Sequence, residues 1–582
     1  MCRFSTSPLD GLTESIPKIL DISKTQLCTV HVGIKDARYF STFRSRDGSR
    51  AQRITADDDG RIFAGASLFK VFIAAAASVM IEKLSANPSP TNKYRGLRNA
   101  WVSTFTDVFN TFSQDFKIGP LHGNPTILNL IVHCKGPCDI NHLLFAPDGS
   151  PLLSANVFLR KISQYTEDTG HLHKNGIPWC EYSNANYILI ALLIEVVSGM
   201  TLHAFLKEHI FIPLGMRRTY MTAEELSLVF NYSIPIEERV YPHLVSGTGV
   251  RRAIVSDKSP NLADTVEIAT TGGYTCAADI GKFFAAVLTG LYGTSINGLF
   301  DHDFTNSLFI GLGSFDGRKD HGYTRFGLST RFDETLPGSH SLNRLVSPES
   351  DSSAYTLEKT SPNDRAGAYY MAGSATGWAC TAYLIPVKQI FVIVLTNTSG
   401  PLDASDVISR LCLQELLDLR PPKLDGGLLT RQPEGGSGMT LAERYRAHYV
   451  ELAARIYEEN ALVFRKLEED DKAPDTPTTH SPNVLGTYIN ARTAQSLEVM
   501  DKDNVLRVRL FEEGGSKSSK LMRFVRKGDG FRICSLDFPG LGIDCFGAWR
   551  NLEFSFEEKD GVIVCLTRRR ALNLVDHFVR KV

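Results

Sequence analysis

The segment around Ser67 and Lys70 combines a nucleophile with a base. It reads Gly65-Ala66-Ser67-Leu68-Phe69-Lys70, and an apolar run, Val71 to Ile81, follows it. Ala and Met favour helices, and a run that is apolar on nearly all sides predicts a helix buried in a core. Residues three apart share one helical face, so the Lys70 amine can take the proton of the Ser67 hydroxyl, and the free N–H groups of the first turn stabilise the anion. The spacing predicts covalent catalysis through Ser67, with a simple helix N-cap as the structural alternative.

The S-x-x-K spacing alone is not specific. Ser15-Ile16-Pro17-Lys18 has the same spacing, but no buried helix follows it. A second polar unit, Tyr182-x-Asn184, precedes an apolar helix predicted from Tyr187 to about Val197. A loop at a helix entrance can point its side chains into a cleft, although packing by the tyrosine and capping by the asparagine would also explain this pattern.

Four potential zinc ligands lie close together in the sequence: His133, Cys134, Cys138 and His142. The spacings of known zinc motifs are absent, and Gly136-Pro137 predicts a turn. We therefore expect a loop with buried cysteines here and no metal site.

The composition is that of a globular protein with several domains. The chain has 582 residues, a net charge of −1 and 43% hydrophobic residues, which gives no sign of nucleic-acid binding. The first residues lack the apolar core of a signal peptide, and no apolar stretch reaches the ~20 residues of a membrane span. The 11 cysteines are irregularly spaced, so we expect a reducing, cytoplasmic location and no disulfide framework.

Three domains are expected along the chain. Residues 1–420 contain predicted strands at 368–373, 379–386 and 390–397, a helix at 404–417 and a polar surface insertion at 334–364. Residues 421–483 read as a linker with one helix at 440–467. Residues 484–582 read as an all-β unit. In it, Leu506-Arg507-Val508-Arg509-Leu510 alternates between apolar and basic residues, as in a strand with one solvent-exposed face.

Four motifs in this order resemble those of the serine β-lactamase-related family, the group of class C β-lactamases, DD-peptidases and esterases. They are Ser67-x-x-Lys70, Tyr182-x-Asn184, the glycine pair at 272–273 after Thr271, and the strand end Leu395-Thr396-Asn397. The resemblance covers roughly residues 12 to 420, and the C-terminal unit resembles the lipocalin-like barrels that some members carry. It implies an α/β (α+β) sandwich of antiparallel sheet and helices with an all-helical lobe, no cofactor, and an active site between the lobes.

The resemblance also implies roles for single residues. Ser67 corresponds to the nucleophile, Lys70 to the neighbouring amine, and Tyr182 to the tyrosine that moves protons. Asn184 corresponds to the residue that positions the substrate and the lysine. The backbone N–H groups of Ser67 and Ser374 would form the oxyanion hole.

The third motif of the family departs from its usual form. Its best match is Met371-Ala372-Gly373, where the family has Lys or His in place of Met371. Methionine cannot bind a substrate carboxylate, so we expect an esterase, amidase or acyl-transfer activity in place of penicillin hydrolysis. Lys70 is then the remaining cation that favours ionised Tyr182, and an alkaline pH optimum is expected.

Three functions remain open on the sequence. The first is a serine hydrolase that cleaves a small ester or amide through an acyl-enzyme on Ser67. The second is an acyltransferase of secondary metabolism that passes the same acyl group to an alcohol or amine. The third is a non-catalytic binding protein with this fold, which Met371 alone favours.

Overall fold

A computed structural model describes most of the chain. The described residues are 7–45, 50–55, 60–121, 123–137, 140–147, 149–166, 179–180, 182–232, 239–254, 264–293, 298–309, 311–312, 314–315, 321–325, 327–331, 368–417, 439–471, 474–480, 482–512, 517–528, 530–534, 552–559, 562–569 and 575–581.

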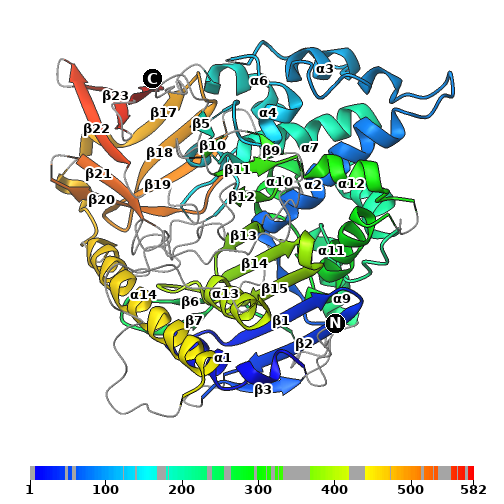
Figure 1. Cartoon of the computed structure of the whole chain (residues 1–582). Coiled ribbons are helices and arrows are strands. Elements are labelled where there is room, and N and C mark those ends of the chain that lie inside the picture. The colour runs from blue at the N-terminus through cyan, green and yellow to red at the C-terminus, as the bar shows by residue number, and fades with distance from the viewer. Residues whose placement is uncertain are drawn as a thin grey trace.

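A nine-stranded sheet forms the centre of the first domain (Figure 1). Its strands, in spatial order, are β3 (Gln52–Thr55), β2 (Ala37–Arg44), β1 (Leu27–Ile34), β15 (Ile390–Thr396), β14 (Trp378–Ile385), β13 (Tyr369–Ala375), β12 (Ser329–Arg331), β11 (His321–Thr324) and β9 (Gly311–Leu312). All of these neighbours are antiparallel. The continuous apolar runs of β14 and β15 are buried along their whole length, as expected of strands covered on both faces.

Helices cover both faces of this sheet. On one face lie α1 (Ser15–Ser23), α13 (Ala404–Leu417) and the long helix α14 (Leu441–Asp471). On the other face lie α2 (Lys70–Ser78) and α11 (Ala277–Leu291). The site described below is on this second face.

A helical lobe extends from α2 and surrounds α7 (Asn184–Ser198). Its other helices are α3 (Phe105–Phe112), α4 (Ile127–Ile131), α5 (Asn141–Leu144), α6 (Ala155–Thr166), α8 (Leu202–Leu206), α9 (Ala223–Tyr232) and α10 (Thr265–Thr271). Helix α12 (His302–Leu308) packs against α11. No single helix in the described ranges has the length and apolar composition of a membrane span. The pair formed by α7 and residues 202–211 meets these criteria together, but it is bent by 80°.

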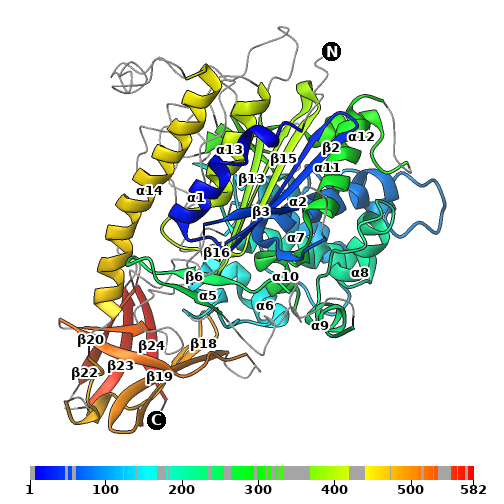
Figure 2. The same ribbon diagram turned by 90° about the horizontal axis from the view of Figure 1, so that it is seen from below.

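A closed barrel follows α14 (Figure 2). Its strands are β17 (Gly486–Asn490), β18 (Gln495–Lys502), β19 (Val505–Glu512), β20 (Met522–Lys527), β21 (Gly530–Cys534), β22 (Glu553–Lys559), β23 (Val562–Arg569) and β24 (Val575–Arg580). In β19 the side chains of Leu506, Val508 and Leu510 point into the barrel core, which confirms the predicted alternation. The barrel is consistent with a lipocalin-like domain.

Polar contacts join the barrel to the helical lobe. The Glu512 carboxylate accepts hydrogen bonds of 2.7 Å from both the backbone N–H and the hydroxyl of Ser154. Lys517 pairs at 2.8 Å with Glu267 of α10, whose side chain is almost completely buried. The barrel is therefore anchored next to α10, which lies beside the candidate site.

Most predicted elements of the first domain are present, with small shifts at their ends. The helix predicted from Tyr187 begins three residues earlier, so Asn184 is its first residue. The helix at 404–417 is confirmed, and that at 440–467 extends to Asp471. The predicted insertion at 334–364 lies outside the described residues.

One cysteine takes part in a disulfide, which the sequence analysis did not expect. The residue is Cys134, and its partner is not among the cysteines whose side chains the structure describes.

Candidate active site

The turn that carries Ser67 is held in an unusual backbone conformation. Short strands β4 (Phe63–Ala64) and β8 (Tyr274–Thr275) pair on one side of it, and a 3₁₀ turn, Ala66–Phe69, leads into α2. Ala66 has a φ of 43°, in the left-handed region that non-glycine residues rarely occupy, and such strain is found often at functional sites. A Cβ atom at Gly272 would lie 2.3 Å from the Ala66 carbonyl oxygen, so a glycine is required there.

Two polar side chains converge on the Ser67 hydroxyl. The Tyr182 hydroxyl donates to Ser67 Oγ at 2.7 Å, and Lys70 Nζ lies 3.2 Å from the same oxygen. Ser67 itself is partly exposed. The structure thus brings together the three residues that the sequence predicted from widely separated segments.

Lys70 is buried, with 1% of its surface exposed. Desolvation lowers the pKa of its amine to about 7, because burial disfavours the charged form. Its second hydrogen-bond partner is the backbone carbonyl of Thr270 at 3.2 Å, at the end of α10. A substantial fraction of Lys70 is therefore neutral at neutral pH, which a proton acceptor for Ser67 requires.

Burial shifts the pKa of Tyr182 in the opposite direction from that of Lys70. Desolvation raises the pKa of its hydroxyl well above the usual value, and the hydrogen bond with Ser67 offsets this only in part. The phenol therefore keeps its proton at neutral pH and acts as a donor toward Ser67. The alkaline pH optimum of activity expected from the sequence depends on an ionised tyrosine as the base. The pKa directions of the two groups favour the neutral Lys70 amine as the base.

His133 supports the Tyr182 loop. Its Nδ1 accepts a hydrogen bond of 3.1 Å from the backbone N–H of Ser183, and its ring packs against the Tyr182 ring with centroids 4.8 Å apart. Among the described residues, His133, Cys134 and His142 do not form a group that could hold a metal ion, and Cys138 lies outside them. The sequence placed His133 in the right loop but gave no sign of this role.

Asn184 contacts other residues than the resemblance implied. Its amide nitrogen donates to Asn141 Oδ1 at 2.9 Å, and its oxygen lies 3.4 Å from the Tyr182 hydroxyl. Asn184 thus orients the tyrosine side of the site, whereas Lys70 is held by Thr270.

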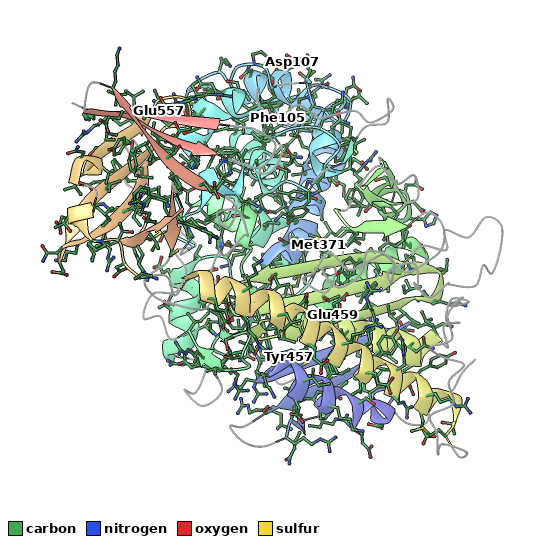
Figure 3. All side chains as sticks on the ribbon, turned by 90° about the vertical axis from the view of Figure 1, so that its left-hand side faces the viewer. Phe105, Asp107, Met371, Tyr457, Glu459 and Glu557 are labelled. Atoms are coloured by element: carbon green, nitrogen blue, oxygen red, sulfur yellow. The ribbon has the colours of Figure 1, made fainter. Side chains whose placement is uncertain are left out.

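The third-motif strand β13 crosses the Ser67 turn closely. A Cβ atom at Gly373 would lie 2.6 Å from the Gly65 carbonyl oxygen and 3.0 Å from the Leu68 nitrogen, so this position requires a glycine. Side chains two apart in a strand share a face, so Met371 points to the same side of the sheet and is 5% exposed. Figure 3 places Met371 near the middle of the molecule. Met371 carries no charge, unlike the Lys or His that the resemblance implies at this position. The strand nevertheless approaches the Ser67 turn closely at Gly373.

Asp279, near the start of α11, has a structural role. Its carboxylate accepts from the backbone N–H of Arg218 and pairs with Lys282, both at 2.6 Å.

Comparisons with known proteins agree with this architecture. Residues 147–414 match the family model described as Beta-lactamase, a range that holds Tyr182, Asn184 and β13 and begins after Ser67. Penicillin-binding protein 4* of Bacillus subtilis (strain 168) is 33% identical over 102 residues, which are 18% of this chain and 22% of that relative. The chain therefore matches only about a fifth of the length of this curated relative.

A solved structure is similar over nearly the whole length. The octameric penicillin-binding protein homologue from Pyrococcus abyssi aligns over 98% of both chains, with 16% identity and a TM-score of 0.49. Residues 147–414 therefore carry a β-lactamase domain of helices and antiparallel sheet, of the serine β-lactamase-related family, and a closed barrel follows later in the chain.

Proposed function

We propose that the protein is a serine hydrolase that cleaves a small ester or amide through an acyl-enzyme on Ser67. The observation that carries this proposal is the convergence of the Tyr182 hydroxyl and the buried Lys70 amine on the hydroxyl oxygen of Ser67, a partly exposed residue. A simple helix N-cap needs neither group.

The proton path follows from the two pKa directions. With Lys70 neutral, the Ser67 hydroxyl donates its proton to Nζ as Oγ attacks the substrate carbonyl carbon. The carbonyl oxygen becomes an anion, which the backbone N–H groups of Ser67 and Ser374 are positioned to receive in this proposal. The Tyr182 phenol is the nearest neutral donor and supplies a proton toward the leaving group. The Lys70 ammonium returns its proton to the Tyr182 oxygen, which resets both groups. Water then attacks the acyl carbon and gives one proton to the neutral Lys70 amine, which passes it to Ser67 Oγ as the acyl C–O bond breaks and the acid product leaves.

Met371 narrows the substrate class in this proposal. A buried thioether offers no charge for a carboxylate, so substrates without a carboxylate next to the scissile bond are favoured over penicillin-like compounds.

Covalent labelling tests the proposal. The full-length protein is treated with a fluorophosphonate, and the adduct is located by intact-mass and peptide analysis. We expect one adduct on Ser67, abolished in Ser67→Ala. Ser15→Ala is the matched control, because Ser15 stands in the same S-x-x-K spacing but lies buried in α1. Equal labelling of Ser67→Ala and the wild type would refute the proposal.

A further inference from the structure

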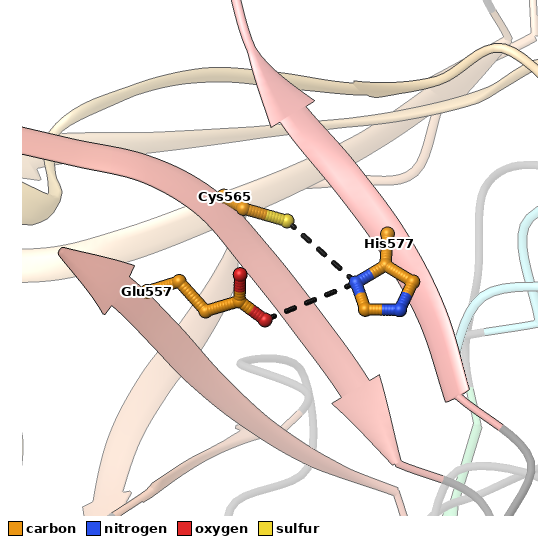
Figure 4. A group of neighbouring side chains, drawn as sticks. All are labelled: Glu557, Cys565 and His577. Atoms are coloured by element: carbon orange, nitrogen blue, oxygen red, sulfur yellow. Dashed lines mark hydrogen bonds and ion pairs between the residues drawn. The ribbon is translucent and has the colours of Figure 1, made fainter. Parts of the chain in front are cut away.

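Three side chains with metal-binding chemistry meet on neighbouring strands of the barrel (Figure 4). They are Glu557 on β22, Cys565 on β23 and His577 on β24, and their ligand atoms all lie within 4.8 Å of one another. We propose that they form a binding site for a borderline divalent transition metal, with Zn²⁺ as the best match.

The strand register fixes this arrangement. Glu557 pairs with Cys565 across β22 and β23, and His577 pairs with Thr567 across β23 and β24. Neighbouring strands are held by backbone hydrogen bonds, so Glu557 and Cys565 start about 5 Å apart, and His577 is the diagonal neighbour of Cys565, about 7–8 Å away. His577 is on the outer face, because Phe578, the next residue, is completely buried in the barrel core.

The distances match a tetrahedral zinc site after small movements. Cys565 Sγ and Glu557 Oε1 each lie 3.9 Å from His577 Nδ1. With zinc bonds of about 2.3 Å to sulfur and 2.0–2.1 Å to nitrogen and oxygen, tetrahedral geometry requires about 3.6 Å and 3.3 Å for these two pairs. The side chains of Glu557 and His577 are more than half exposed, so they are free to close this gap, and the solvent side leaves room for a fourth ligand.

Two further features distinguish this cluster from an ordinary surface ion pair. The Thr567 hydroxyl donates to Glu557 Oε1 at 2.8 Å, and such outer partners orient ligands in metal sites. Cys565 is a free thiol, and it lies on the same face of the sheet as Glu557, which pairs with it across the strands. An ion pair between glutamate and histidine needs no thiol beside it, whereas thiolate, imidazole and carboxylate together are zinc ligands.

Cobalt substitution tests the site in the full-length protein. Co²⁺ is titrated into metal-free protein, and thiolate-to-cobalt charge transfer is recorded in the near ultraviolet, with competition by Zn²⁺. We expect one equivalent bound with a charge-transfer band, and loss of this band in Cys565→Ser. His577→Gln should weaken Zn²⁺ binding by at least about tenfold.

The control is Glu558→Gln, an exposed neighbour outside the cluster, which should bind as the wild type does. Circular dichroism and thermal melting of each variant establish that the barrel is folded. The absence of a charge-transfer band in the wild type, or its persistence in Cys565→Ser, would overturn the proposal. Neither result bears on Ser67, whose labelling is measured separately.

Discussion

The pH dependence of acylation tests which residue takes the proton of Ser67. The perturbation is a change of pH from 5 to 10 in the wild type and in Tyr182→Phe. Because the Lys70 pKa is about 7, roughly one molecule in ten has a neutral amine at pH 6 and about one in a hundred at pH 5. We therefore expect kcat/KM to fall about tenfold per pH unit below 7 and to level off above 8.

The assay is kcat/KM on a p-nitrophenyl ester, paired with the rate of fluorophosphonate labelling, which reports acylation alone. Tyr182→Phe should lower both rates by about 10²–10⁴-fold and keep the rising limb near pH 7, because the limb belongs to Lys70. A rising limb above about pH 9 in the wild type would mean that ionised Tyr182 is the base. That result, or a limb that disappears in Tyr182→Phe, would refute the reasoning.

Three further predictions concern Lys70, its neighbour in the site His133, and the contact of Lys517 with α10. Lys70→Met should raise the free energy of unfolding at pH 6 by as much as ~5 kcal/mol, because folding lowers the Lys70 pKa from 10.5 to about 7 and protonation of the amine therefore opposes folding. Urea unfolding at several pH values should show the full gain below pH 7 and its loss as the pH rises toward 10.5. His133→Ala should lower kcat roughly 10–100-fold with KM nearly unchanged, because the Tyr182 ring loses its packing partner. The control is His302→Ala, a histidine outside the site, and an equal loss of kcat in that variant would contradict this. Lys517→Met should lower the free energy of unfolding by about 1–3 kcal/mol, because the buried carboxylate of Glu267 loses its partner, and the double variant with Glu267→Gln should recover part of it.

Sequence patterns predicted the elements that are governed by burial. The apolar run of β15 is continuous, so its position follows from hydrophobicity alone. The start of α7 was placed too late, because Asn184 and Asn186 are polar yet buried in the lobe. Polar residues of this kind are held by tertiary hydrogen bonds, which no local pattern records.

The sequence predicted the side chains that carry the chemistry of the candidate site, but not the groups that hold these side chains in place. Ser67, Lys70 and Tyr182 carry recognisable chemistry, and the structure brings them together. The Thr270 carbonyl that holds Lys70 is a backbone group, so its residue type gives no signal. His133 appeared only as a possible metal ligand, because its packing against Tyr182 depends on a contact between distant segments.

The order of strands in the central sheet has a consequence for how the chain folds. β1 lies between β2 and β15, and Cys28 pairs with Thr396. Because Cys28 and Thr396 are 368 residues apart (396 − 28), β1 is synthesised long before its neighbour β15 leaves the ribosome. Contacts so distant in sequence slow folding, and until β15 arrives one long edge of β1 is open to pairing with other chains. We expect chaperones to engage the nascent chain at this edge, and truncation before β15 to produce aggregation in place of a smaller folded enzyme.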